Sequence, residues 1–167
     1  MNKSSTNKIV FSALFAALIF IGTQFIKIPL SIGYIHIGDT FILLAGYYIG
    51  GYYAVIASVL GSVLADIFSG YLIYAPATFI IKGLMALIII AFCKNTVKSK
   101  TLLFVLGSAL AEACMILGYL IYDIILYGPS GIIVSLSGNL LQAVGGIVIS
   151  TATLLLLEKS KISKLFK

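Results

Sequence analysis

The chain has 167 residues, of which 61% are hydrophobic and only 10% are charged, and its formal net charge is +6. Soluble domains carry about a quarter of their residues as charged side chains, so this chain lacks the polar surface of a water-exposed globule. A helix that crosses a bilayer needs about 20 apolar residues. The length therefore admits about five to seven spans and leaves no room for a soluble catalytic domain.

The positive charge is clustered, which argues against a nucleic-acid partner. The chain has no arginine, and nine of its eleven lysines fall in three groups. Lysine clusters of this kind are typical of the cytoplasmic loops of membrane proteins. The groups are Lys3 and Lys8; Lys94, Lys98 and Lys100; and Lys159, Lys161, Lys164 and Lys167.

In chain order, we expect six transmembrane helices over residues 9–26, 37–50, 52–69, 76–93, 102–127 and 133–157. The first apolar run has no convincing signal-peptide cleavage site, so we interpret it as a helix. The run from Ile37 to Phe68 would extend about 48 Å, which exceeds the hydrocarbon thickness of about 30 Å. Gly50 and Gly51 divide this run into two helices, and Pro76 suits the first position of the fourth helix.

The lysine clusters give the orientation. With six spans all three clusters lie on one side, whereas a single span over 37–68 would separate them. We therefore predict an all-α membrane protein whose N- and C-termini are both cytoplasmic. Cys93 and Cys114 are predicted to lie at different depths, so they read as small apolar residues and not as a disulfide.

Polar residues inside the spans are costly and are functional hypotheses by default. Here they concentrate in the outer half of the predicted bundle, which suits a site that takes a small polar ligand from outside. A channel or pump would need polar groups across the whole thickness. The ionisable and amide residues of this outer half are Asp39, Asp66, Lys82, Glu112, Asp123, Asn139 and Gln142, accompanied by Tyr34, His36, Tyr71, Tyr74, Tyr119, Tyr122 and Tyr127.

Structural roles remain open for several of these residues. Lys82 would form an ion pair with Glu112 or Asp66, and Asp39 would cap its own helix. Asn139 and Gln142 would form interhelical hydrogen bonds. His36 has no companion histidine or cysteine, so no metal site is expected.

Catalytic motifs are missing from the sequence, which contains no phosphate-binding loop, HExxH or GxSxG pattern. We expect transport or binding and no enzymatic activity or cofactor. The first helix carries small residues at Ala13 and Ala17, a step that lets another helix approach closely. Both alanines lie in the cytoplasmic half, where they would form a docking surface for a partner.

Short motifs follow one another in a recognisable order. They are Tyr34-Ile-His36-Ile-Gly-Asp39, Leu64-Ala-Asp66-Ile-Phe-Ser-Gly70-Tyr, Tyr74-Ala-Pro76, Ile81-Lys82-Gly83-Leu-Met85, Ala111-Glu112, Gly118-Tyr119 and Gly138-Asn139-Leu-Leu-Gln142. In this order the chain resembles the substrate-binding S components of energy-coupling factor (ECF) vitamin transporters, in the riboflavin-type group. The resemblance extends from about Ala13 to Ile149.

This resemblance implies a six-helix, multi-pass protein of the prokaryotic plasma membrane that binds a vitamin or precursor in an outward pocket. The pocket would be capped by the loop between the first two helices. The implied partner is an ECF module of one transmembrane coupling protein and two cytoplasmic ATPases, which Ala13 and Ala17 would contact. The implied substrate-binding residues are Tyr34, His36, Tyr74, Lys82, Glu112, Tyr119, Asn139 and Gln142.

The ligand is less defined than the family. A pocket with both Lys82 and Glu112 suits a small pyridoxine-like or hydroxymethylpyrimidine-like heterocycle, and we rank riboflavin second. An alternative is a stand-alone proton-coupled carrier that uses Asp66, Lys82 and Glu112 as a relay, and a further one is a structural subunit without a ligand. Uptake by the protein alone distinguishes the carrier from an S component.

Overall fold

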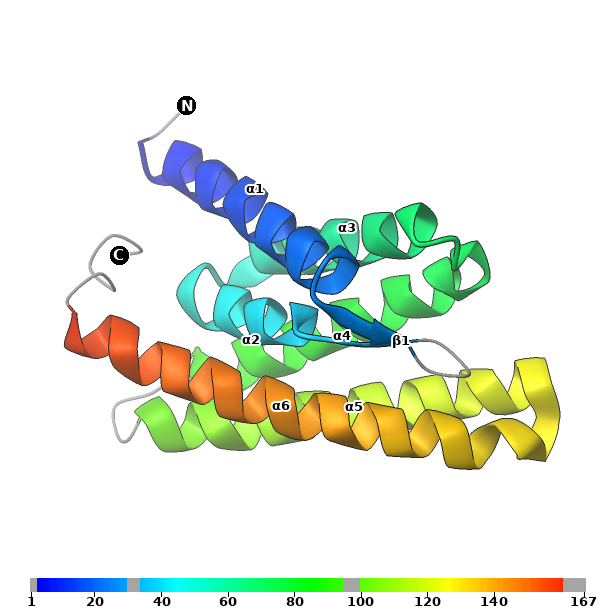
Figure 1. Cartoon of the computed structure of the whole chain (residues 1–167). Coiled ribbons are helices and arrows are strands. Elements are labelled where there is room, and N and C mark those ends of the chain that lie inside the picture. Colours follow the sequence, from blue (N-terminus) through cyan, green and yellow to red (C-terminus); the bar gives the residue numbers. More distant parts are fainter. Residues whose placement is uncertain (1–2, 30–33, 95–99, 161–167) are drawn as a thin grey trace.

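A computed structural model of the chain describes residues 3–29, 34–94 and 100–160, and it is almost entirely helical (Figure 1). The described residues form six α-helices, a short β-hairpin and two short 3₁₀ turns. In chain order these elements are α1 (Lys3–Gln24), β1 (Lys27–Pro29), β2 (Tyr34–His36), α2 (Gly38–Tyr48), α3 (Gly51–Phe68), η1 (Leu72–Tyr74), α4 (Ala75–Cys93), α5 (Lys100–Tyr127), η2 (Gly128–Gly131) and α6 (Ile132–Lys159).

The helical membrane fold agrees with the prediction, but α2 is not a full span. Five helices of the described residues are long and apolar enough to cross a bilayer, and α2 is not among them. Its 11 residues rise only about 16 Å, half of the hydrocarbon thickness. Its side chains are buried from Ile42 to Ala45, and it packs against α1, α3, α4 and α6. The second predicted span is therefore an internal, half-length helix.

The β-hairpin connects α1 to α2. The sequence analysis did not predict it. The two strands pair antiparallel, with Lys27 opposite His36 and Pro29 opposite Tyr34. Each strand has only three residues, too few for an alternating pattern to stand out from the surrounding apolar sequence. Figure 1 shows the hairpin lying across the bundle between α1 and α6, with α2 continuing from it.

The predicted break at Gly50 and Gly51 is confirmed. Both residues have positive φ angles, of 63° and 57°, which residues with a Cβ rarely adopt. The chain can therefore turn sharply between α2 and α3. Close packing of α2 depends on another glycine, because a Cβ at Gly46 would lie 1.7 Å from Cγ2 of Ile89 on α4.

The outer surface of the bundle is largely apolar, and many polar side chains are buried inside it. Large hydrophobic side chains are widely exposed, with exposed fractions of 69% for Phe68, 71% for Ile125 and 68% for Leu156. Contiguous apolar surface of this kind marks contact with lipid or protein rather than with water. The chain is therefore a multi-pass membrane protein with polar groups sheltered in its interior.

The described parts of the three lysine clusters lie at one end of the bundle. In Figure 1 the start of α1, the end of α4, the start of α5 and the end of α6 all lie at the same end. Lys94, Lys100 and Lys159 are exposed there, as the orientation argument expects. Lys98, Lys161, Lys164 and Lys167 lie outside the described residues. Both cysteines are free.

Candidate binding site

A buried ion pair between α2 and α4 forms the centre of the candidate site. Nζ of Lys82 lies 2.6 Å from Oδ1 of Asp39, and the two side chains are 1% and 0% exposed. The sequence analysis expected Lys82 to pair with Glu112 or Asp66, and this prediction was therefore wrong. The expectation that Asp39 caps its helix was also wrong, because Ile37 occupies the N-cap of α2 and no side chain caps it. The hairpin starts α2 inside the bundle, which brings Asp39 to Lys82.

Gln142 on α6 connects this ion pair to the hairpin. Its Nε2 donates a hydrogen bond of 2.7 Å to Oδ2 of Asp39, and its Oε1 accepts one of 3.1 Å from the backbone N–H of His36. Nδ1 of His36 in turn accepts a bond of 3.0 Å from the N–H of Gly38. The predicted interhelical hydrogen bond of Gln142 is therefore confirmed. The side chain joins α6 to α2 and to the hairpin.

Glu112 on α5 is the second carboxylate of this buried cluster, and it has a different environment. Its side chain is 1% exposed, yet neither carboxylate oxygen has a hydrogen-bond partner within the described residues. The carboxylate lies against Gly146 of α6, where a Cβ would come within 2.4 Å of Oε1 and within 3.6 Å of the Asp39 Cβ. Gly146 therefore leaves room for Glu112 next to the Asp39–Lys82 pair.

Tyrosines form a separate layer around the other carboxylates. Tyr34 donates a hydrogen bond of 2.8 Å to Asp66, and Tyr74 donates one of 2.6 Å to Asp123. Tyr119 links this layer to the ion pair, since its hydroxyl bonds Thr78 at 2.9 Å and its ring centroid lies 5.4 Å from Nζ of Lys82. The tyrosine layer is extended by Tyr71, whose ring lies 5.1 Å from that of Tyr34 and 6.2 Å from that of Tyr74.

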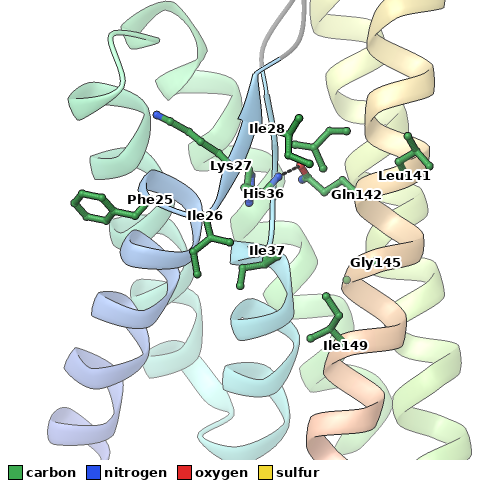
Figure 2. Close-up of a pocket in the computed structure, with 12 residues that line it drawn as sticks. Phe25, Ile26, Lys27, Ile28, His36, Ile37, Leu141, Gln142, Gly145 and Ile149 are labelled. Atoms are coloured by element: carbon green, nitrogen blue, oxygen red, sulfur yellow. Dashed lines mark hydrogen bonds between the residues drawn. The ribbon is translucent and has the colours of Figure 1, made fainter.

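A cavity of about 350 Å³ lies between the hairpin and α6. Figure 2 shows Gln142 reaching from α6 toward His36, with the isoleucines of the hairpin region on the opposite wall. This volume is at the lower end of the range of about 300–1,000 Å³ for small-molecule sites. The lining residues that also belong to the polar cluster are His36, Gln142 and Gly146.

Burial sets the protonation state of the hairpin groups beside this cavity. It lowers the pKa of His36 to about 4, because the charged imidazole loses its hydration. The nearby Asp39 carboxylate partly opposes this shift, and the charge of Lys82 adds to it. The neutral ring can then accept the bond from Gly38 through Nδ1. Burial, followed by the charge of Asp66, raises the pKa of the Tyr34 hydroxyl, so Tyr34 remains a hydrogen-bond donor.

The predicted site residues thus divide into two groups. His36, Lys82, Glu112 and Gln142 surround Asp39, and Tyr119 adjoins them, whereas Tyr34 and Tyr74 belong to the tyrosine layer. Asn139 is half-buried, three residues before Gln142 on α6.

Asp39 is the residue that the predicted site lacked. The signal for it was present, since a carboxylate at the head of an apolar run is expensive without a partner. Ala13 and Ala17 are exposed on α1, whereas Phe15 and Ile19 of the same helix are buried.

Comparison with family models identifies the family of this chain. The family model of the ECF-type riboflavin transporter S component matches residues 3–159. A Pyrococcus woesei protein described as an uncharacterized protein in a gap 3′ region is 37% identical over 134 residues, which are 80% of this chain and 88% of that protein. The matched family is a component of membrane transporters and not a class of enzymes. Since the match covers nearly the whole sequence, the chain belongs to the ECF-type riboflavin transporter S component family.

Proposed function

We propose that this chain captures a small vitamin or vitamin precursor outside the cell and delivers it to the cytoplasm together with an ECF module. The module consists of a transmembrane coupling protein and two cytoplasmic ATPases, and the membrane is the plasma membrane of a prokaryote. The observation that carries the proposal is the buried cluster of Asp39, Lys82, Glu112 and Gln142, which adjoins a cavity of about 350 Å³.

A compact heterocycle of the pyridoxine or hydroxymethylpyrimidine kind is the favoured ligand. The cavity is small, and the polar groups beside it suit hydroxyl, amino and ring-nitrogen substituents. The chain has no tryptophan, so a flat ring would stack on tyrosine or phenylalanine. Riboflavin, which the family name mentions, has three fused rings and a sugar-alcohol chain, and it ranks second because Lys82 and Glu112 together suit a smaller heterocycle.

Binding without ATP tests this function directly. The full-length protein in lipid nanodiscs is titrated calorimetrically with a panel of vitamins and precursors. One compound should bind tightly in the absence of any ATPase. No binding by any member of a broad panel would contradict the proposal.

Uptake experiments separate the proposal from the carrier that uses Asp66, Lys82 and Glu112 as a relay. Liposomes that contain this protein alone should not accumulate the ligand in response to a pH gradient. Accumulation under those conditions would favour the carrier. The Asp39–Lys82 pair favours the S component, because it occupies the lysine that a relay would need.

The exposed alanines of α1 provide a test of the ATPase partnership. Ala13→Leu or Ala17→Leu would block the close approach of a partner helix but leave the interior unchanged, since both residues face outward. We expect ligand binding to persist and ATP-dependent uptake to fall at least about tenfold, a coupling loss of about 1.4 kcal/mol.

Ala113→Leu is the matched control for these variants. Ala113 is exposed on α5 and lies four residues after the exposed Ala109, so it presents the same small-residue spacing on another helix. Uptake by this variant should remain normal. Loss of ligand binding in Ala13→Leu would instead assign Ala13 to internal packing and contradict the docking role.

A further inference from the structure

A second hollow, with a volume of about 300 Å³, lies between α4 and α5. It shares no lining residue with the cavity between the hairpin and α6. Ala77 and Ile81 are buried and form its floor, whereas Ile80 and Ile121 are exposed on its two walls, at 60% each. None of the described residues that line it is charged. The hollow is therefore an apolar groove on the outer surface of the bundle.

A glycine on α5 makes room for this groove. A Cβ at Gly118 would lie 2.7 Å from Cγ1 of Ile81 on α4, so the two helices approach closely at this point. On either side of it, Ile80 of α4 and Ile121 and Ile125 of α5 are exposed. The missing side chain between these large ones produces a furrow along the two helices instead of a flat surface.

The groove has the length of one bilayer leaflet. α4 has 19 residues, which rise about 28 Å and nearly match the hydrocarbon thickness of about 30 Å. The lining positions on α4 extend from Pro76, its second residue, to Leu84, its tenth. The groove thus covers the half of the hydrocarbon that lies away from the lysine clusters, and it is continuous with the apolar surface that contacts lipid.

The shape and chemistry of the groove distinguish between possible occupants. Transmembrane helices associate closely where small residues let their backbones approach, but here large isoleucines form both walls and keep another helix at a distance. A polar ligand would find few partners, because the Tyr122 hydroxyl donates its hydrogen bond to the carbonyl of Ile73 and the thiol of Cys114 is only weakly polar. A flexible hydrocarbon chain meets neither obstacle.

We propose that this groove binds one acyl chain of a phospholipid from the outer leaflet. The proposal does not depend on the proposed function. Lipid tails are as apolar as the helix surface, so burial brings no hydrophobic gain. Retention comes from dispersion contacts with the floor and both walls, which are more numerous than on a single helix face. The chain would contact Ile81 and so support the segment of α4 that carries Lys82.

Photocrosslinking to lipid tests this proposal. The full-length protein is placed in nanodiscs whose phosphatidylcholine carries a diazirine at different depths of the acyl chain, and crosslinked residues are mapped by mass spectrometry. Leu84 and Ile121 line the groove, whereas Leu87 and Leu117 lie outside it on the same two helices. All four are exposed aliphatic side chains, so their reactivity is matched. The yield at the first two should be about threefold or more higher, because the groove adds dispersion contacts.

Cys114→Phe should abolish this difference, because Cys114 lines the groove and a phenylalanine ring would fill it. The matched control is Ala113→Phe, since Ala113 is the exposed neighbour on α5 that does not line the groove. The control should keep the difference between the two pairs of positions. Ala77→Leu fills the groove from α4 and serves as a second variant, and the midpoint of thermal unfolding shows which variants are folded.

Equal yields at all four positions of the parent protein would overturn the proposal, because the groove would then hold lipid no better than the surrounding surface. Lower yields at Leu84 and Ile121, together with a dimer in native mass spectrometry, would assign the groove to a second copy of the chain. A difference that persists in a folded groove-filling variant would also overturn the proposal. If neither filling variant folds, the comparison within the parent protein decides the outcome.

Discussion

The Asp39–Lys82 pair is a residue-level constraint on how α2 sits in the bundle. Two charges buried to this extent are expensive to desolvate, and their attraction compensates only when geometry and additional hydrogen bonds are good. Here the separation is 2.6 Å and Gln142 provides a further bond to Asp39. The pair therefore specifies one position of α2 against α4 more than it adds net stability.

Removing one partner of this pair should destabilise the protein strongly. Lys82→Met leaves the Asp39 carboxylate buried without its cation, and we expect a loss of about 3–5 kcal/mol in the free energy of unfolding. The double variant Asp39→Asn with Lys82→Met should recover most of that loss, because no unpaired charge remains. Unfolding in mixed micelles followed by circular dichroism measures both.

Lys94→Met serves as the control for lysine removal, since Lys94 is exposed and surface substitutions change stability by about 0.5 kcal/mol or less. Equal losses in Lys82→Met and in the double variant would contradict the argument. They would mean that the packing of the lysine stem matters and its charge does not.

At the level of elements, the hairpin is the part of the structure that assembles the site. It is attached on one side to α3, where Lys27 donates a bond of 2.7 Å to Ser69 and Tyr34 bonds Asp66. On the other side it is attached to α6 through His36 and Gln142. The hairpin thus closes one wall of the cavity by bonds to two helices.

The pH dependence of stability should report on this hairpin. His36 has a pKa of about 4 in the folded protein against 6.5 for the free side chain. Between these values the unfolded chain binds more protons, so the free energy of unfolding falls as the pH drops from 6.5 to 4. The contribution of His36 is complete above pH 6.5, and its loss amounts to at most about 3 kcal/mol.

His36→Asn isolates this contribution, because the asparagine oxygen can accept the bond from Gly38 but does not titrate. The measurement is the difference in unfolding free energy between the two proteins across this pH range, which cancels the contribution of the carboxylates. A difference that does not change between pH 4 and 6.5 would show that His36 is not buried in its neutral form.

The elements also show what could be predicted from the sequence. Long apolar runs and the Gly50–Gly51 break located the five long helices and the start of α3, because length and backbone conformation are local properties. The hairpin and the short α2 depend on contacts with distant helices, such as the bond between His36 and Gln142, which are 106 residues apart. For the same reason the sequence placed Lys82 and Glu112 in the site but assigned Asp39 to a cap.

For the whole molecule, we propose six passes, of which the five long helices make five and the shorter return of the chain between α1 and α3 makes one. The hairpin and α2 together return the chain across the bundle, so α3 begins near the end where α1 begins (Figure 1). The lysine clusters then share one side, which the positive-inside rule assigns to the cytoplasm. If the chain between α1 and α3 did not complete this pass, the two ends of the protein would lie on opposite sides.

Cysteine labelling with a membrane-impermeant maleimide tests this topology. Cys93 and Cys114 are first replaced by alanine, which is conservative because neither forms a disulfide. Single cysteines are then placed at exposed positions near the two ends of the bundle, and labelling is compared in intact and permeabilised cells. Ligand binding by each variant shows that the fold is kept.

We expect Leu72→Cys and Pro129→Cys, which are exposed in η1 and η2, to react in intact cells. Lys8→Cys, Lys94→Cys and Lys159→Cys should react only after permeabilisation, since these exposed lysines mark the cytoplasmic end. Reaction of Lys8→Cys from the side opposite to Lys159→Cys would mean an odd number of passes. The six-pass arrangement would then be wrong.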